Sequence, residues 1–242
     1  MTRFISHLHS DLRHARTTRR GATKAASEVP LGLHKKYPRM KRIPLPDVTL
    51  PDATITEVLR TRRCAEYGEI AFDITFKDYA ALFSMTLKQH ENTNHRPYPS
   101  GGGLYPIETY LLTPVFDSQP GGVFHYNPSE HALEYLWPLK DSAGFRKLLP
   151  RAEPLEFSAL LVFTSVWDRS SAKYGDYTYP FGLLEAGHMS QNILLAATAL
   201  GIAARPMAGF NDGALIDNLD VDPDYEQPIH TVTLSKTREK RS

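Results

Sequence analysis

The chain has 242 residues, which is long enough for one large domain or two small ones. Its 28 basic and 27 acidic side chains nearly balance, so the composition gives no indication of nucleic-acid binding. The only cysteine, Cys64, excludes an intrachain disulfide and is typical of a reducing compartment, which predicts a cytoplasmic protein. The longest apolar stretch, residues 193–204, is too short to cross a bilayer, and residues 1–26 lack the apolar core of a secretory signal. We therefore expect no association with a membrane.

The first 50 residues are basic and rich in proline. Residues 1–26 carry six arginine or lysine side chains against Asp11 alone. They form either a partner-binding arm or a solvated tail, and a charge run of this kind favours the tail. Residues 30–51 mix prolines with basic residues, which predicts an extended segment packed along a surface. We therefore expect an arm and leader over residues 1–50 and a folded domain over residues 51–242.

The folded part mixes helical and strand patterns. Helices are expected from Thr54 into Arg62, over residues 74–87, over residues 180–200 with Gly201 at the end, and from Asn211 to Leu219. Strands are expected over residues 107–113, 121–127, 132–137, 159–166, 205–210 and 229–234. The turn residues at 127–129 predict that the second and third of these strands pair as a hairpin.

Residues 96–108 combine prolines at both ends with three central glycines. Proline fixes φ and removes an amide donor, whereas glycine removes the side chain from that face of the backbone. A stiff, bare backbone suits close approach to a flat ligand. An ordinary surface turn has the same composition, so these residues alone leave the two interpretations about equally favoured.

The sequence Pro-Ser-Gly-Gly-Gly-Leu-Tyr-Pro-Ile-Glu at 99–108 resembles the signature of the SagB-type flavin dehydrogenases, a branch of the FMN-dependent nitroreductase superfamily. The leader around Lys36-Tyr37-Pro38, the hairpin at 122–133 and the Glu-x-Gly-x-x-x-Gln-Asn pattern starting at Glu185 resemble that family too. The resemblance implies an α+β fold with a mostly antiparallel sheet flanked by helices. It also implies a homodimer in which the long helix takes part, with FMN bound at the subunit boundary.

The same resemblance implies which residues bind FMN. The family's Arg-Arg-Ser-x-Arg phosphate motif reads Arg62-Arg63-Cys64-Ala65-Glu66 here, so the third arginine is replaced by an acid. Planar guanidinium groups suit bidentate contacts with phosphate oxygens. The implied FMN contacts are Arg62, Arg63, Cys64, Pro99, Ser100, Gly101, Gly102, Leu104, Gln191, Met207, Ala208, Gly209, Lys236 and Arg238. No metal site is expected.

The candidate catalytic residues are Lys173 and Tyr174, within an aromatic and polar stretch (167–179) that predicts a loop. Taken alone, Lys173 is best interpreted as a solvated surface lysine, although a desolvated lysine can act as a base. In McbC-type azoline dehydrogenases a Lys-Tyr pair precedes the long helix, and this pair lies twelve residues before Glu185. That resemblance implies Lys173 as the base and Tyr174 as its orienting partner.

The implied activity is FMN-dependent oxidation of peptide thiazolines or oxazolines to thiazoles or oxazoles, in the biosynthesis of a ribosomally made, modified peptide. Oxygen would reoxidise the flavin. The implied partners are an azoline-containing precursor peptide and a cyclodehydratase complex. Two alternatives stay open at this point: an NAD(P)H-dependent nitro or quinone reductase of the same fold, and a flavin-binding scaffold subunit of a peptide-modifying complex.

Overall fold

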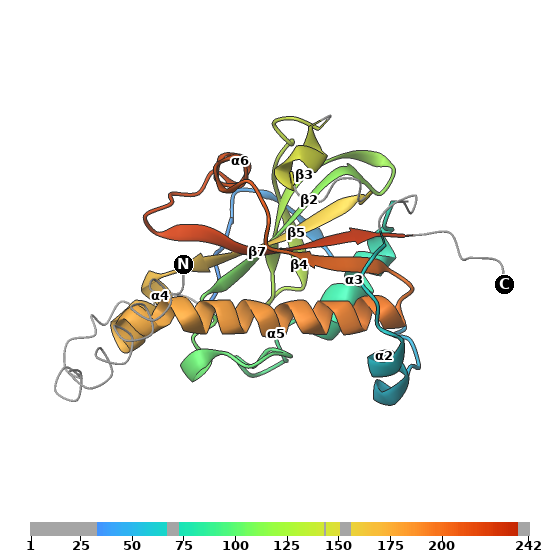
Figure 1. The fold of residues 1–242 in the computed structure, drawn as a ribbon, viewed down its shortest axis with the longest axis horizontal. Coiled ribbons are helices and arrows are strands. Elements are labelled where there is room, and N and C mark those ends of the chain that lie inside the picture. The colour runs from blue at the N-terminus through green and yellow to red at the C-terminus, as the bar shows by residue number, and fades with distance from the viewer. Residues whose placement is uncertain (1–32, 67–72, 143, 151–155, 237–242) are drawn as a thin grey trace, which may run out of the picture.

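The described part of the chain is built on a single antiparallel sheet (Figure 1). The computed structural model describes residues 33–66, 73–142, 144–150 and 156–236. In these ranges the strands are β1 (Lys41–Pro44), β2 (Ile107–Phe116), β3 (Gln119–Asn127), β4 (Ala132–Trp137), β5 (Ala159–Val166), β6 (Ala203–Met207) and β7 (Glu226–Ser235). Their order across the sheet is β1-β4-β3-β2-β5-β7-β6, and every neighbouring pair is antiparallel.

The expected strands are confirmed, with small changes at their ends. β3 and β4 pair as the predicted hairpin, with a register shift between Val123 and Phe124. β5 has the predicted bounds and lies between β2 and β7, so both of its edges are hydrogen-bonded. Its uninterrupted apolar sequence follows from that position, because residues 159–163 are fully buried on both faces of the sheet.

The expected helices are also confirmed. They are α2 (Ile55–Thr61), α3 (Phe76–Thr86), α5 (Thr178–Ala199) and α6 (Asp212–Leu219). The Thr54 side chain accepts a hydrogen bond from the Glu57 amide, and Asn211 caps α6 in the same way. α5 begins two residues earlier than predicted and is followed by Gly201, whose φ of +66° ends the helix.

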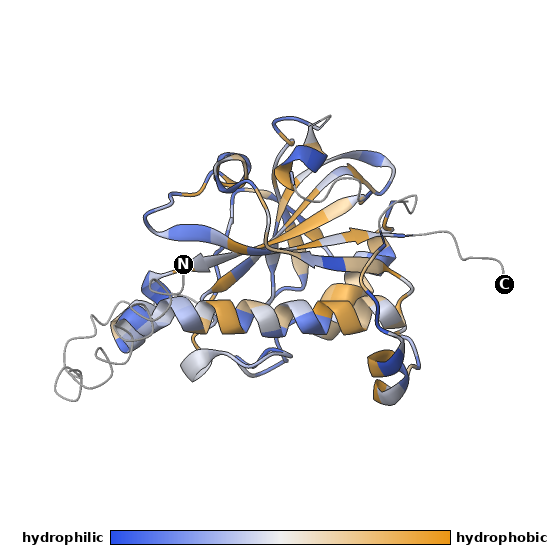
Figure 2. Ribbon diagram, viewed as in Figure 1, coloured by the Kyte–Doolittle hydropathy of each residue, from blue (hydrophilic) through white to orange (hydrophobic). Residues whose placement is uncertain are grey.

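Helices cover both faces of the sheet. α5 and α3 pack on one face, where their side chains join Ile107 and Leu111 of β2 in the larger apolar core. α6 and a short 3-10 turn, η3 (Phe145–Leu148), lie on the other face, against Tyr110 and Leu112. Because β2 alternates its side chains, one strand supplies both cores. Figure 2 shows the apolar strands enclosed between these layers. No helix among the described residues is long and apolar enough to span a membrane.

The segment after β5 contradicts the sequence prediction. Residues 167–179 were expected to form a loop, but they contain helix α4 (Asp168–Tyr174), a 3-10 turn, η4 (Gly175–Tyr177), and the start of α5. Propensity gave no sign of α4 because the helix is held by tertiary contacts: Arg169 and Ser170 are buried in the protein. Gly175, with a φ of +55°, separates α4 from the turn that follows.

Part of the expected surface leader joins the sheet. β1 pairs with β4 and is an exposed edge strand, while Lys35 forms an ion pair with Glu226 of β7. The segment is extended, as predicted, but it contributes a strand and is not merely laid on a surface. Residues 1–32 of the arm lie outside the described residues, as does Arg238. The division at residues 50 and 51 stays a prediction.

Candidate functional site

The glycine loop, residues 99–104, presents bare backbone at the surface beside the start of α5. Its Gly101–Gly103 stretch is a 3-10 turn in which Gly102 has a φ of +65°, a conformation that side chains disfavour. A Cβ at Gly102 would lie 2.6 Å from the Lys173 ammonium and closer still to the Tyr174 hydroxyl. The backbone conformation therefore favours glycine here, and a side chain would also have to displace the ends of Lys173 and Tyr174.

The structure brings Lys173 and Tyr174 together with the glycine loop. Both lie in the last turn of α4, and the Lys173 ammonium is 5.2 Å from the centre of the Tyr174 ring. The Tyr174 ring in turn packs edge-on against Phe181 of α5, at 5.1 Å between ring centres. Lys173 is exposed and Tyr174 is half-buried, so a ligand on the glycine loop could reach both side chains.

The rear of the glycine loop is fixed by hydrogen bonds to two helices, α4 and α5. The Ser100 hydroxyl donates to the Glu185 carboxylate of α5 at 2.5 Å and accepts from the Tyr105 amide at 2.9 Å. Arg169 of α4 donates to the Tyr105 carbonyl at 2.7 Å. Further along α5, Asn192 donates to the Pro97 carbonyl at 2.8 Å. We call the loop with Lys173 and Tyr174 the glycine-loop end of the site.

A buried charge cluster stands behind these contacts. Arg169 donates to Glu108 of β2 at 2.6 Å, and His125 lies 2.8 Å from both Glu108 and Glu134. Burial opposes charge on Glu108, but Arg169 and His125 hold its pKa well below the usual value. Burial also disfavours charge on His125, yet its two carboxylate partners raise its pKa. The cluster thus anchors α4 to the sheet through charged groups.

A second group of predicted residues lies near the start of β6. The Ala65 amide donates to the Ala204 carbonyl, which places Arg62, Arg63 and Cys64 beside that strand. Arg62 contacts the Cys64 sulfur at 3.7 Å, and Arg63 donates to the carbonyls of Arg60 and Arg62. Lys236 follows β7, whose Ser235 pairs with Ala203, and its ammonium is 2.9 Å from Asp78. We call Arg62, Arg63, Cys64 and Lys236 the arginine end.

The remaining predicted residues lie between the two ends. Met207 pairs with Thr231 of β7 and is followed by the exposed Ala208 and the half-buried Gly209. Gln191 is on the exposed side of α5. The sequence therefore identified a set of residues that follows the length of α5, and none of the described members is in the core.

One chain does not bring the two ends together. Gly101 lies beside Phe181, near the start of α5, whereas Val58 of α2 lines a hollow with Ala199, near its end. Ala199 is 18 residues after Phe181, which corresponds to about 27 Å of helix. That length exceeds the reach of one FMN molecule. A site that contains both ends therefore needs more than one copy of the chain.

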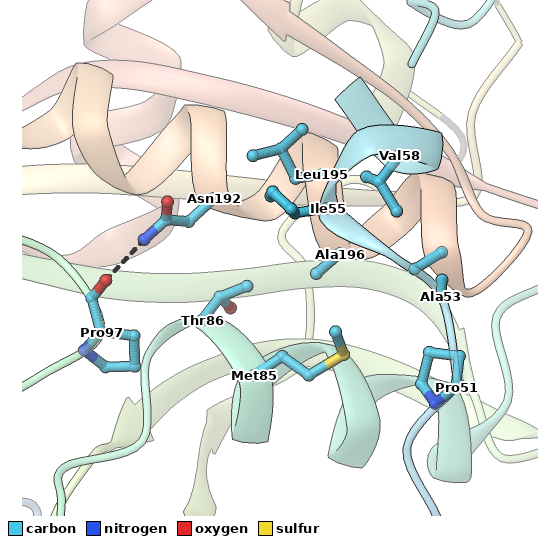
Figure 3. Close-up of a pocket in the computed structure, with 11 residues that line it drawn as sticks. Pro51, Ala53, Ile55, Val58, Met85, Thr86, Pro97, Asn192, Leu195 and Ala196 are labelled. Atoms are coloured by element: carbon cyan, nitrogen blue, oxygen red, sulfur yellow. Dashed lines mark hydrogen bonds between the residues drawn. The ribbon is translucent and has the colours of Figure 1, made fainter. Parts of the chain in front are cut away.

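The hollow at the far end of α5 is apolar and has a volume of about 320 Å³ (Figure 3). It is lined by α2, α3 and the second half of α5, with Ile55, Met85 and Leu195 among the side chains around it. The hydrogen bond between Asn192 and Pro97 closes one side. None of the candidate catalytic or phosphate-binding residues lines it.

Comparison with known proteins agrees with the expected fold. Residues 45–235 match the family described as Nitroreductase family. The chain belongs to the nitroreductase family. Over 142 residues it is 32% identical to the microcin B17-processing protein McbC of Escherichia coli. That match covers 55% of the chain but only 52% of McbC, so the chain matches about half the length of this relative.

Two solved structures share the fold. The E. coli microcin synthetase McbBCD complex with truncated pro-MccB17 bound contains a chain that matches with a TM-score of 0.63 and 23% identity, over 80% of this chain and 77% of that one. The NADPH:FMN oxidoreductase of Vibrio harveyi, complexed with NAD+, matches with a TM-score of 0.51 and 15% identity, over 76% and 69% of the two chains. At these identities the matches show the fold alone. They confirm the predicted α+β architecture.

Three functional residues were missed from the sequence: Glu108, Arg169 and Glu185 as anchors of the glycine-loop end. Glu185 belongs to the Glu-x-Gly-x-x-x-Gln-Asn pattern that resembles the family, but the sequence assigned it no role. Their contacts join residues 61 to 85 positions apart, so no local spacing could reveal them. For Glu108 and Glu185 the usable signal was a charged residue inside an apolar strand or helix pattern, whereas Arg169 lies in a polar stretch that gave no such signal.

Proposed function

We propose that this chain oxidises thiazoline or oxazoline rings in a peptide to thiazoles or oxazoles, with FMN as the cofactor. Membership of the nitroreductase family supports an oxidoreductase, and the identity with McbC supports action on a modified peptide. The observation that carries the proposal is the contact between the Lys173-Tyr174 pair and the bare backbone at Gly102. A base and a hydroxyl are thereby held beside a surface suited to a flat ring.

The residues present fit FMN. A Cβ at Gly103 would meet nothing within 4 Å, so the backbone there is open to a planar ring, and the arginine end supplies cationic donors for a phosphate. When bound, FMN would supply the two-electron acceptor for a hydride. Arg62 and Arg63 would hold the phosphate with Lys236, and residues 207–209 would lie along the cofactor.

The protein's own part in the reaction is to take a proton. Aromatising an azoline ring removes a hydride from one carbon and a proton from its neighbour. Lys173, as a free amine, would accept that proton at Nζ, and the Tyr174 hydroxyl would orient the amine or the ring. Lys173 is exposed in the single chain, so the desolvation that favours a free amine must come from bound peptide, cofactor or a second copy.

The proposed site is shared by two copies of the chain. If the α5 helices of two copies pair in opposite directions, the glycine-loop end of one meets the arginine end of the other. Exposed apolar side chains support this pairing at both ends of α5: Tyr179, Leu183 and Leu184 at its start, and Ile55 and Leu59 of α2 beside its end. A twofold interface needs a self-complementary surface, and this pairing would place the apolar patch at the start of α5 in one copy against the apolar hollow of the other.

Gly187 supports the same pairing. It lies on the exposed side of α5, and a Cβ there would meet nothing within 4 Å, so the described chain has no need of a glycine. Mid-helix glycine costs about 1 kcal/mol relative to alanine, which close approach of a second helix would explain.

The proposed partners follow from the same reaction. The substrate is an azoline-containing precursor peptide, and a cyclodehydratase would form its rings. The similarity to the McbBCD complex supports such an assembly. Within the cell the expected location is the cytoplasm, where the cofactor and a newly made precursor are both available.

The function is tested by adding FMN to the purified protein and supplying a short peptide that contains one thiazoline. Mass spectrometry should show loss of two hydrogen atoms from the peptide, without NADPH and with oxygen present. If the peptide is unchanged while NADPH rapidly reduces the bound flavin, the chain is a reductase of the same fold. If neither reaction occurs in protein that binds FMN, the scaffold interpretation replaces both.

The shared site is tested with Gly187→Leu. A leucine side chain in the helix contact should convert the dimer to a monomer, measured by light scattering, and should weaken FMN binding at the same time. Gly213→Leu is the matched control, because that glycine lies on α6, on the other face of the sheet. A Gly187→Leu monomer that still binds one FMN per chain would contradict the shared site.

A further inference from the structure

Glu185 is a buried carboxyl that the proposed reaction does not use. It lies in the first half of α5 and is 2% exposed. One oxygen, Oε2, accepts the Ser100 hydroxyl at 2.5 Å, whereas Oε1 has no hydrogen-bond partner among the described residues. A buried acid with an unsatisfied oxygen is costly to keep, so a role beyond packing is needed to explain it.

The hydrogen bonds around Ser100 have one consistent direction. The Ser100 oxygen accepts the Tyr105 amide, at 2.9 Å, so its own hydrogen is free to point at Glu185. A carboxylate at Glu185 completes this chain with a charge-assisted hydrogen bond. The chain links α5 to both ends of the glycine turn, since Ser100 precedes Gly101 and Tyr105 follows Leu104.

Charged groups on other elements lie close enough to Glu185 to influence its ionisation. Arg96, at the entrance to the loop, and Arg169, on α4, both favour its charged form. Among the described residues, the acid that Arg169 hydrogen-bonds is Glu108, whose charge Arg169 and His125 balance. Tyr98, bonded to Arg96, is the nearby phenol. Burial raises its pKa, Arg96 opposes this, and the charge on Glu185 adds to the rise. Glu185 is therefore the group on this side of the loop whose ionisation changes the local charge.

We infer that Glu185 is a positioning residue: its carboxylate holds Ser100 from inside the protein and thereby fixes the glycine loop against Lys173 and Tyr174. The inference rests on the proposed function for what the loop and the lysine do. Within the described residues, Glu185 makes no hydrogen bond to Lys173 or Tyr174. Its influence passes through Ser100 to Gly101 and Gly102, and from Gly102 to the pair.

The charge state of Glu185 should set how firmly the loop is held. Burial raises the pKa of Glu185 to about 7, against the Ser100 hydrogen bond and the charges of Arg96 and Arg169. Above that pH the hydrogen bond from Ser100 is charge-assisted, and below it the bond joins two neutral groups. The loop is therefore held more firmly at pH 8 than at pH 5.5, and a neutral glutamine at this position abolishes the difference.

Hydrogen exchange of the Tyr105 amide in the FMN-free protein tests this directly, because that amide reports local opening of the loop. After correction for intrinsic exchange, Glu185→Gln should speed Tyr105 exchange by about tenfold at pH 8 and should match the wild type at pH 5.5. Ser100→Ala should be fast at both pH values. In the double variant the two effects should not add, since both break one linked contact.

Ser190→Ala is the matched control. Ser190 is a buried serine of α5 whose hydroxyl is hydrogen-bonded to His230 of β7 at 3.1 Å, and among the described residues it makes no hydrogen bond to the glycine loop. It should leave Tyr105 exchange unchanged. Equal Tyr105 exchange in Glu185→Gln and the wild type at pH 8, with both proteins folded by circular dichroism, overturns the inference.

The activity measurement separates this inference from the proposed function. With FMN and the thiazoline peptide, Glu185→Gln should lower kcat by about tenfold at pH 8, with KM little changed, and should match the wild type at pH 5.5. A wild-type protein that leaves the peptide unchanged removes the proposed function, while the exchange result still decides whether Glu185 holds the loop. Unchanged kcat at pH 8 in an active protein overturns the positioning role.

Discussion

The two ends of α5 are built in different ways. At the glycine-loop end, Ser100, Tyr105 and Pro97 are each bonded to a side chain of α4 or α5, and a buried charge cluster supports one of those side chains, Arg169. At the arginine end, the hydrogen bonds that Arg62 and Arg63 make within the described chain join them to residues of their own segment. One end is fixed before any ligand arrives, whereas the other keeps its guanidinium groups at the surface.

This difference suits different tasks. Proton transfer requires a base placed within hydrogen-bond reach of the reacting atom, and small displacements reduce the rate steeply. Binding a phosphate requires positive charge and donors, which flexible side chains supply with little loss. The substitutions below test whether the glycine-loop end governs rate and the arginine end governs cofactor affinity.

The largest effect is expected for Lys173→Ala. If Lys173 is the base, azoline oxidation should slow by about two to four orders of magnitude, the usual contribution of a positioned base. FMN affinity and thermal stability should be close to those of the wild type, because the side chain is exposed. The rate is measured by mass spectrometry of the thiazoline peptide, and the affinity by flavin fluorescence.

Tyr174→Phe is the companion to that variant. It keeps the ring that packs on Phe181 and removes only the hydroxyl. A loss smaller than that of Lys173→Ala assigns orientation to Tyr174 and proton transfer to Lys173. Wild-type rates in Lys173→Ala would remove the main support for azoline oxidation and favour the reductase interpretation.

The next effect concerns stability at the glycine-loop end. The pKa of Glu185 is raised from 4.5 to about 7 in the folded chain, so the folded protein binds this proton more tightly than the unfolded chain does. The contribution of Glu185 is therefore fully present below pH 4.5 and is lost as the pH rises through 7. Relative to Glu185→Gln, the wild type should lose about 3 kcal/mol of unfolding free energy between pH 4.5 and pH 8.5.

Urea unfolding of both proteins without FMN, at those two pH values, measures this change. The sign is informative: the glutamine variant becomes relatively more stable at high pH, the condition under which it should be slower in catalysis. Parallel pH dependence in the two proteins would mean that Glu185 is already ionised across this range, as an exposed acid would be.

Much of the fold could be predicted from the sequence because its determinants are local. The caps at Thr54 and Asn211, the buried run of β5 and the glycine loop all depend on neighbouring residues, and all are confirmed in the structure. Helix α4 could not be predicted, because buried Arg169 stabilises it through Glu108, 61 residues away.

The candidate site was predictable as a list of residues but not as an arrangement. The glycine loop meets Lys173 and Tyr174 only because α4 is a helix, and the sequence predicted a loop there. The separation of the arginine end from the glycine-loop end depends on where along α5 the glycine loop and α2 pack. Such positions follow from tertiary packing, which periodicity does not encode.

A smaller effect is expected for Arg62→Ala, at the arginine end. Loss of a charge-assisted hydrogen bond to the phosphate should weaken FMN binding by about 1.5–3 kcal/mol, so that flavin separates from the protein on gel filtration. The rate at saturating FMN should change little, in contrast to Lys173→Ala. Arg39→Ala, an exposed arginine of the leader, is the control and should retain its flavin. Full retention of flavin by Arg62→Ala would place the phosphate elsewhere.

The smallest effect, of opposite sign, is expected for Glu66→Arg. Glu66 is exposed and follows Arg62 and Arg63 at the position where the resembling family has a third arginine. Replacing the acid changes the local charge by two units beside the proposed phosphate, which should tighten FMN binding by about 0.2–1 kcal/mol, the range for exposed charge pairs. The gain should shrink as salt is raised from low to physiological concentration, because exposed charges are screened.

Glu91→Arg, an equal change of charge on the exposed loop before the glycine loop, should leave affinity and its salt dependence unchanged. Affinity unaltered by Glu66→Arg at low salt would mean that the phosphate lies beyond the reach of residue 66.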